Sequence, residues 1–310
     1  MKRGILLKFF REIKKNHQLY LLMLPGLICI IVFSYLPMFG HLLAFKDYTF
    51  DGGVFFSPWN DFKNFKFFFT SDDWKTVTFN TLYLNALFIV FTQVLAVTIA
   101  IMLNEVRSEL FKRISQSMIF LPYFVSWLVV SLMLLALFNG TDGLINKTIL
   151  EPLGLESYPF FMRPEIWPAI LTGAYVWKFA GYYSVIYIAS IIGISPEYFD
   201  AAKVDGATKW QQIRYITLPL IRQTVIIMLL LAIGRIFFGD FGMIYGIIGD
   251  NGVLFPTTDV IDTYVYRALR QLGNFGMSSA VSLFQAVLGL VTIVIFNSIV
   301  RRIDENASLF

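Results

Sequence analysis

Six long apolar stretches constrain the fold of this chain more than any other feature of its sequence. A helix needs about 20 mostly apolar residues to cross the hydrocarbon core of a bilayer, which is about 30 Å thick. The stretches of sufficient length are Leu19–Met38, Thr81–Leu103, Ile114–Phe138, Ile166–Ile192, Thr224–Ile248 and Gly276–Val300. Charged residues make up only 15% of the chain, whereas a soluble domain commonly has about 25%. The sequence therefore predicts an all-α integral membrane protein with six transmembrane helices.

Lysine and arginine are unevenly distributed around these stretches. The N-terminus, the loops 104–113 and 193–222 and the C-terminal tail are richer in them than the longer loops on the opposite side. Because loops rich in lysine and arginine stay in the cytoplasm, we expect both termini to be cytoplasmic. The first stretch ends in Tyr35-Leu36-Pro37 rather than in a small-residue cleavage site, so we expect a retained anchor.

The predicted organisation is a single membrane domain. It consists of a basic cytoplasmic N-terminus over residues 1–18, a six-helix transmembrane domain over 19–300 and a cytoplasmic tail over 301–310. In the first outer loop, aromatic residues recur at helical intervals between polar ones; they are Phe55, Trp59, Phe62 and Phe69. This stripe fits two arrangements. The segment can lie in the lipid headgroup layer with its aromatic face toward the lipid, or its aromatic residues can pack against neighbouring spans.

The loop between the fourth and fifth stretches, residues 193–222, has the residues of a short, sharply bounded helix. Ser195 is placed to cap a helix Pro196–Val204 that begins with proline. Glu197 lies in the first turn, where its negative charge interacts favourably with the positive end of the helix dipole. Gly206 supplies the freedom for a sharp turn, a second helix is expected near Thr208, and Pro219 marks the return toward the membrane. A short cytoplasmic helix held in this way is expected to dock on a partner.

This loop resembles the EAA loop of binding-protein-dependent ABC transporter permeases, whose pattern is E-A-A, three residues, G, nine residues and I-x-L-P. The matching residues are Asp200-Ala201-Ala202, Gly206 and Ile216-Thr217-Leu218-Pro219, with aspartate in place of the usual glutamate. The resemblance extends to the carbohydrate type of permease, LplB-like and related to the maltose permeases. The segments that carry it are Ser34–Gly40, Ala44–Tyr48, Asn80-Thr81, Leu121–Trp127 and Ala307–Phe310.

The resemblance implies a type I ABC importer permease in the bacterial plasma membrane. The loop would hold the coupling helix that inserts into a separate ATPase, with ATP and Mg on that ATPase and no cofactor on this chain. The residues assigned to coupling are Glu197, Asp200, Ala201, Ala202, Asp205 and Gly206. The implied partners are a second homologous permease, two ATPase subunits, and a lipid-anchored or periplasmic solute-binding protein. The implied substrate is an oligosaccharide.

Polar residues inside the predicted spans mark a candidate solute pathway, because such residues usually face a bundle interior or a wet cavity. Tyr175, Lys178 and Tyr182 share one face of the fourth span. Arg235 lies thirteen residues after Arg222, about 20 Å further along the fifth span, and Gly239 follows one turn later. Aromatic faces with hydrogen-bonding groups suit a sugar, and two cations favour an acidic one.

Alternative roles for these residues stay open from the sequence. Lys178 can extend outward to the interface, and Arg235 can pair with Asp240 or with a partner helix. The chain has no phosphate-binding loop, since Gly140–Thr148 lacks the required spacing, and no metal-ligand or catalytic pattern in its spans. It is therefore expected not to be an enzyme. An ion-coupled secondary carrier, for which broken helices and a midplane carboxylate are expected, and an ABC permease for a non-sugar solute are the alternatives.

Overall fold

The computed structural model describes residues 14–70, 73–140, 142–304 and 308–309. These residues fold almost wholly into helices, and the one β-contact among them is an isolated bridge between Lys46 and Trp59. The longer helices are α2 (His17–Ile30), α5 (Lys63–Thr70), α6 (Asp73–Glu105), α7 (Glu109–Phe120), α8 (Trp127–Phe138), α9 (Trp167–Ile192), α10 (Pro196–Val204), α12 (Leu218–Ile233), α13 (Phe241–Ile248), α15 (Ile261–Arg270) and α16 (Phe275–Ile303). The short ones are α3 (Leu36–Met38), α4 (Gly53–Phe56), α11 (Lys209–Gln212) and α14 (Phe255–Thr258). Parts of the predicted terminal segments, residues 1–13, 305–307 and 310, lie outside the described chain.

Four helical stretches among the described residues are long and apolar enough to cross a membrane. They are His17–Phe45, Asp73–Glu105, Lys209–Ile233 and Phe275–Ile303. Two bent pairs of helices reach the same length together: Glu109–Phe124 with Trp127–Phe138, bent by 95°, and Pro164–Ile192 with Pro196–Val204, bent by 68°. The predicted number of six spans is therefore reached with each bent pair counted as one span.

The third predicted span is not continuous. The expectation of an unbroken helix over Ile114–Phe138 is wrong, because α7 ends at Phe120 and α8 begins only at Trp127. A 3₁₀ turn that contains Pro122 lies between them. Since proline has no N–H and its ring crowds the preceding turn, it disfavours a continuous α-helix at this point. The result is an elbow, residues 121–126, within the span.

The fifth predicted span has the wrong bounds. It was expected over Thr224–Ile248, but the helical stretch begins at Lys209 and ends at Ile233. A non-helical segment, residues 234–240, separates it from α13. We call this segment the fifth-span break. Hydropathy averaged over a span does not detect it, because its two charged residues, Arg235 and Asp240, are outweighed by the apolar residues around them.

Three π-helical turns each end two residues before a proline. The turns are Ile31–Tyr35, Asn146–Leu150 and Ile213–Thr217, and the prolines are Pro37, Pro152 and Pro219. In each case the residue before the proline donates its N–H to the carbonyl five residues back. The wider turn compensates for the missing proline N–H and reduces the crowding that its ring would cause. The helix therefore passes through Pro219, where the chain was expected to return toward the membrane.

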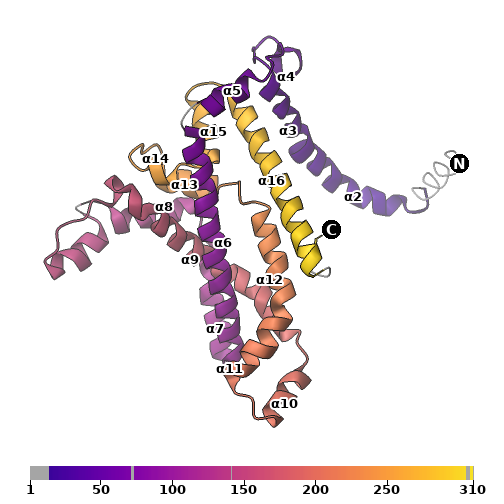
Figure 1. Cartoon of the computed structure of the whole chain (residues 1–310), viewed down its shortest axis with the longest axis vertical. Coiled ribbons are helices and arrows are strands. Elements are labelled where there is room, and N and C mark those ends of the chain that lie inside the picture. The colour runs from indigo at the N-terminus through magenta and orange to yellow at the C-terminus, as the bar shows by residue number, and fades with distance from the viewer. Residues whose placement is uncertain (1–13, 71–72, 141, 305–307, 310) are drawn as a thin grey trace.

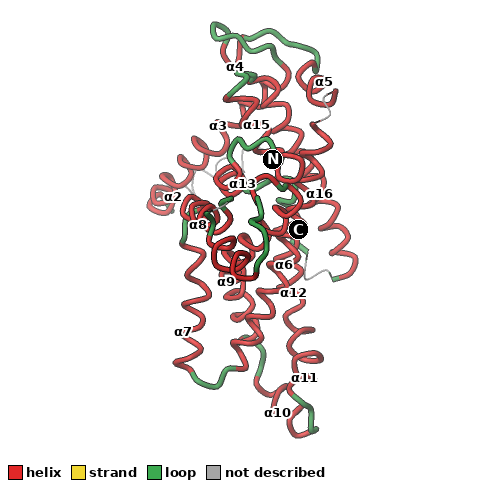
Figure 2. Tube along the Cα trace, turned by 90° about the vertical axis from the view of Figure 1, so that its left-hand side faces the viewer, coloured by secondary structure: helices red, strands yellow, loops and turns green. Residues whose placement is uncertain are grey.

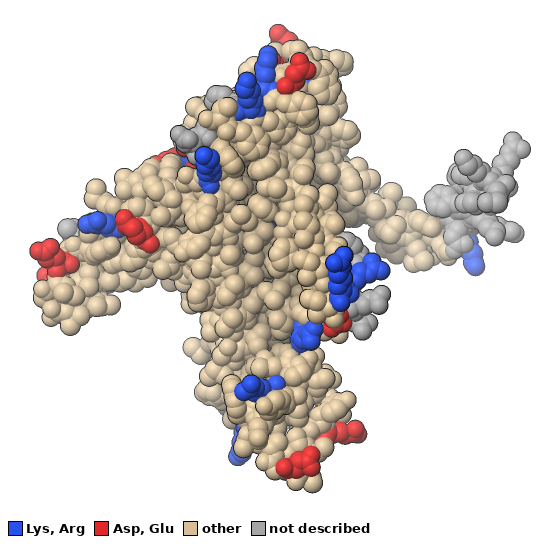
Figure 3. All heavy atoms as spheres, in the orientation of Figure 1, with Lys and Arg blue, Asp and Glu red and all other residues tan. Residues whose placement is uncertain are grey.

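The core lies where α6 and α9 pack side by side (Figure 1). One buried cluster joins them to α8 and α13 and includes Phe88 and Trp167, and another joins them to α12 and includes Tyr187 and Ile221. Figure 2 shows α10 and α11 at one end of the molecule and α4 and α5 at the other, with α6 and α12 between them. By contrast, α2 lies apart from them and has no buried residue (Figure 1). On the face shown in Figure 3, charged side chains lie toward the ends and edges, and uncharged surface covers the middle.

Candidate substrate pathway and coupling helix

A cavity of about 700 Å³ lies between α6, α9, α12 and the fifth-span break. The fourth span contributes aromatic rings to its wall, and the break contributes a cation, a glycine and a carboxylate. The lining residues that concern the pathway are Tyr175, Phe179, Tyr182, Tyr183, Arg235, Gly239 and Asp240. Four of the five predicted pathway residues, all except Lys178, therefore line one cavity.

Polar side chains from three other helices hold the fifth-span break in place. Asn85 of α6 donates from its amide nitrogen to the carbonyls of Ile236 at 2.9 Å and Phe238 at 3.2 Å. Gln285 of α16 donates to the carbonyl of Phe237 at 2.6 Å. Non-helical backbone at membrane depth is tolerated only where its polar groups are satisfied within the protein or face a wet cavity. These side chains meet that requirement.

Asp262 and Gly239 complete the support of the break. The Asp262 carboxylate accepts hydrogen bonds from the Gly239 N–H at 2.6 Å and from the Gln285 amide at 2.9 Å. A Cβ at Gly239 would come within 2.9 Å of Val260 Cγ2 and 3.0 Å of the Asp262 carboxylate. Sequence reasoning predicted Gly239 but missed its supporting residues. Asn85 and Gln285 could have been found, since polar residues inside apolar spans mark sites of this kind.

Arg235 and Asp240 line the same cavity but are not paired. Arg235 is exposed, and its guanidinium has no hydrogen bond or ion pair with any residue in the described part of the chain. Asp240 caps α13 by accepting the Met243 N–H at 3.0 Å, and its other oxygen accepts the Trp127 indole N–H at 2.9 Å. The alternative in which Arg235 pairs with Asp240 is therefore not the arrangement in this structure. The guanidinium remains available to a ligand in the cavity.

Lys178 has a position that neither of its predicted roles anticipated. Its residue surface is only 7% exposed, so it neither lines the cavity nor extends to the membrane surface. Its ammonium donates to the carbonyls of Tyr123, at 2.8 Å, and Val125, both in the elbow of the third span. It also lies 5.3 Å from the centre of the Trp127 ring, within the range of a cation–π interaction. Lys178 thus binds the elbow from the neighbouring helix.

Helix α10, the predicted coupling helix, has the predicted bounds, Pro196–Val204, and none of its residues is buried. It lies at one end of the molecule, away from the core (Figure 1). Gly206 has φ +76°, as its predicted turn requires. Thr208 caps the next helix in a capping box with Gln211. The expected cap at Ser195 is absent, because its side chain makes no capping hydrogen bond.

The predicted coupling residues lie together on this exposed element. Glu197, Asp200, Ala201, Asp205 and Gly206 are exposed, and Ala202 is half-buried. Asp200 forms an exposed ion pair with Lys203 at 2.8 Å, which is worth about 1 kcal/mol or less. Lys209 forms another with Glu105, also at 2.8 Å, at the end of α6. The second pair joins the loop to the helix that forms one wall of the cavity.

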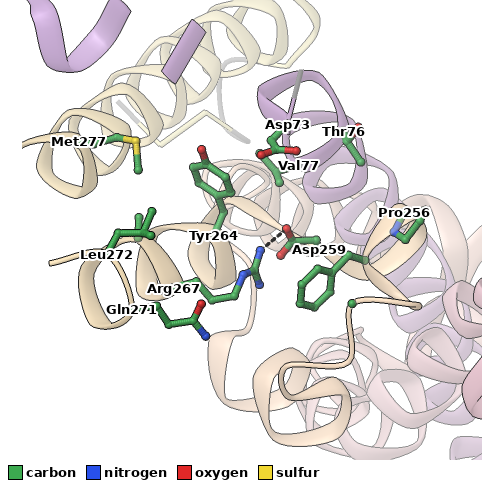
Figure 4. Close-up of a pocket in the computed structure, with 13 residues that line it drawn as sticks. Asp73, Thr76, Val77, Pro256, Asp259, Tyr264, Arg267, Gln271, Leu272 and Met277 are labelled. Atoms are coloured by element: carbon green, nitrogen blue, oxygen red, sulfur yellow. Dashed lines mark hydrogen bonds and ion pairs between the residues drawn. The ribbon is translucent and has the colours of Figure 1, made fainter. Parts of the chain in front are cut away.

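A second cavity, of about 720 Å³, lies where the start of α6 meets α14, α15 and the start of α16 (Figure 4). Arg267 and Asp259 form a largely buried ion pair in its wall. The guanidinium also lies 4.1 Å from the centre of the Phe255 ring. None of the predicted site residues lines this cavity. The charge of Arg267 is already used to hold the segment around α14 against α15.

Known proteins resemble this chain over almost its whole length. Residues 93–305 match the family model described as the binding-protein-dependent transport system inner membrane component. Protein LplB of Bacillus subtilis (strain 168) is 34% identical over 299 residues, which cover 96% of this chain and 93% of that protein. The polygalacturonan/rhamnogalacturonan transport system permease protein YteP of the same organism is 33% identical over 304 residues, covering 98% and 92%.

Solved structures show the same similarity in three dimensions. A chain of a bacterial ABC transporter involved in the import of the acidic polysaccharide alginate superposes with a TM-score of 0.87 and 33% identity. The match covers 96% of this chain and 99% of that chain. A chain of the bacterial alginate ABC transporter in complex with an alginate pentasaccharide-bound periplasmic protein gives a TM-score of 0.86, also at 33% identity.

Proposed function

The chain belongs to the family of binding-protein-dependent transport system inner membrane components, and from this premise we propose that it is the permease subunit of an ATP-binding-cassette importer for acidic oligosaccharides. It is a multi-pass inner-membrane protein with the type I permease fold. The observation that carries the choice of substrate is the unpaired guanidinium of Arg235 in an aromatic-lined cavity. The similarity to an alginate importer supports the same choice.

The chemistry of the cavity suits a chain of sugar acids. The rings of Tyr175 and Tyr182 can stack on the apolar CH faces of sugar rings. A guanidinium presents two parallel N–H groups that match the two oxygens of a carboxylate. A single cation among aromatic side chains therefore favours negatively charged sugars. Because it can bind only one carboxylate at a time, the oligosaccharide can still move through the cavity.

Transport proceeds by alternating access in this proposal. A solute-binding protein delivers the oligosaccharide from outside, and a second homologous permease completes the pathway. Two separate ATPase subunits, which hold ATP and Mg, dock on the coupling helix; this chain holds no cofactor and both of its termini are cytoplasmic. Closure of the ATPases moves α10, and the continuous helical stretch Lys209–Ile233 that follows it passes that motion to the cavity.

Uptake by the complete transporter tests this proposal. The chain is reconstituted in proteoliposomes with its partner permease, ATPase and binding protein, and is offered oligoalginate, oligogalacturonate or a neutral galacto-oligosaccharide. We expect ATP-dependent uptake of the acidic probes and stimulation of ATP turnover. Arg235→Gln should raise the KM for the acidic probes about tenfold or more, because one hydrogen bond between charged groups is lost. Arg163→Gln, an exposed arginine outside the cavity, is the matched control.

The other candidate classes give different results in the same assay. An ion-coupled carrier would take up the probe with an ion gradient and no ATP. Broken spans do not separate the two classes, since this chain has them; the family match favours the importer. ATP turnover stimulated by none of the saccharides would favour a non-sugar solute and overturn the proposed substrate.

A further inference from the structure

Lys178 is a buried cation that the proposed transport mechanism does not use directly. Among the described residues, no carboxylate forms an ion pair with it; its ammonium is satisfied by main-chain carbonyls and aromatic rings. A charged residue at membrane depth is costly and is usually functional. We propose that Lys178 is a positioning residue that keeps Arg235 free for the substrate, by holding Trp127 and, through it, the carboxylate of Asp240. This inference rests on the proposed function.

The first step runs from Lys178 to the elbow of the third span. The chain turns by 95° between α7 and α8, so the carbonyls of Tyr123 and Val125 have no regular helical partner at this point. The Lys178 ammonium binds both of them. Because Trp127 is the first residue of α8, the direction in which its ring points depends on how this elbow is held.

The second step runs from Trp127 to Asp240. The indole N–H donates to one carboxylate oxygen at 2.9 Å, and the Met243 N–H donates to the other at 3.0 Å. Both oxygens of Asp240 are therefore engaged. The hydrogen bond also joins the start of α8 to the start of α13, so the two broken spans are connected beside the cavity.

The third step concerns the charge in the cavity. Arg235 and Asp240 are five residues apart and line the same cavity. Released from Trp127, the Asp240 carboxylate would be free to turn toward the unpaired Arg235 guanidinium in the same cavity, and the resulting ion pair would compete with the carboxylate of an acidic substrate. Loss of Lys178 or of the indole N–H should therefore weaken binding of acidic substrates selectively.

The test compares variants in proteoliposomes that contain the complete transporter, with oligogalacturonate as the acidic probe and a galacto-oligosaccharide as the neutral one. Lys178→Met and Trp127→Phe should each raise the KM for the acidic probe about tenfold to hundredfold, as expected for weakening one hydrogen bond between charged groups. The maximal rate and any uptake of the neutral probe should change little. Lys178→Arg, which keeps the donors and the charge, should recover most of the affinity.

A second substitution separates positioning from a purely structural role. Asp240→Asn removes the competing charge and keeps one side-chain oxygen to cap α13, while its NH2 group takes the place of the oxygen that accepts the indole N–H. Added to Lys178→Met or Trp127→Phe, it should restore the KM for the acidic probe. Trp127→Phe keeps an aromatic ring beside Lys178, so the test does not depend on the folding of Lys178→Met.

Two results would overturn the inference. One is an equal loss of acidic and neutral uptake in the single variants, and the other is an acidic KM that Asp240→Asn fails to restore. Both presuppose a wild-type transporter that takes up the acidic probe. A wild type that transports no acidic probe refutes the proposed substrate instead, so the two failures are distinguishable.

Discussion

Single polar side chains decide the shape of this membrane protein at the points where its helices are interrupted. Asn85, Lys178 and Gln285 each donate hydrogen bonds to main-chain carbonyls of another segment. Asn80 does the same for Pro256, at 3.2 Å, and Asp259, at 3.1 Å. A carbonyl that leaves a helix inside the bilayer has no water to bind, so a side chain must take the place of the missing N–H. Each interruption therefore depends on a particular residue elsewhere in the chain.

Gly239 gives a prediction at this scale. In Gly239→Ala the added methyl group would meet Val260 and the Asp262 carboxylate at about 3 Å. Overpacking of this kind costs about 1–3 kcal/mol, so we expect a lower unfolding temperature in nanodiscs and reduced uptake. Gly246→Ala, in α13, is the control, since its added methyl group meets nothing within 4 Å. Equal stability of the two variants would contradict the role assigned to Gly239.

At the scale of the element, the coupling helix shows how a short exposed segment can be ordered without a core. Helix α10 begins with Pro196, ends at a glycine turn and is followed by the capped helix α11. These local features define its bounds although none of its residues is buried. Its surface is therefore open to the partner that we propose docks on it.

Gly206 supplies the second prediction. Any side chain at φ +76° is strained, at a cost of about 1–2 kcal/mol, and Gly206→Asp also adds charge beside the docking helix. We expect normal membrane insertion, measured by the amount of protein in membranes, but loss of uptake and of substrate-stimulated ATP turnover. Gly154→Asp is the matched control, because Gly154 has φ +72° and open space around it but lies outside the coupling loop. Equal losses in both variants would show that backbone strain, rather than coupling, is responsible.

At the scale of the whole molecule, the lengths of the spans place the first outer loop relative to the bilayer. The stretch His17–Phe45 has 29 residues and is about 43 Å long, close to the full bilayer thickness of about 40–45 Å with headgroups. The loop that follows is pinned by the Lys46–Trp59 bridge, yet three residues of the aromatic stripe, Phe55, Trp59 and Phe62, are 60%, 66% and 63% exposed, and the neighbouring Phe56 is 88% exposed. Of the two interpretations of the aromatic stripe, this exposure favours the headgroup layer.

A spin label tests that placement. In a Cys29→Ser background, a nitroxide at Phe56→Cys should be relaxed by lipid-soluble oxygen more than by an aqueous nickel complex in nanodiscs. Val204→Cys is the control: Val204 is also 88% exposed, but it lies on the coupling helix and should favour the aqueous relaxant. A label at position 56 that behaves like the one at position 204 would exclude the headgroup placement.

The sequence by itself determined the features that depend on composition and local pattern. The apolar stretches give the membrane class, and Pro196, Gly206 and Thr208 give the bounds of the predicted coupling helix and its turn. The aromatic and polar residues of the fourth and fifth spans predict the wall of one cavity, because all of the proposed pathway residues except Lys178 line it. Length, hydropathy and turn chemistry are readable here because each acts over neighbouring residues.

Only the tertiary structure decided where the spans break and which cation faces the cavity. The elbow and the fifth-span break lie within long apolar stretches, and they depend on Lys178, Asn85 and Gln285, which are distant along the chain. The same applies to the two predicted pathway cations: Lys178 binds the elbow, whereas Arg235 faces the cavity. The physical reason is that a main-chain carbonyl at membrane depth must find a donor within the protein, and the folded arrangement determines which donor reaches it.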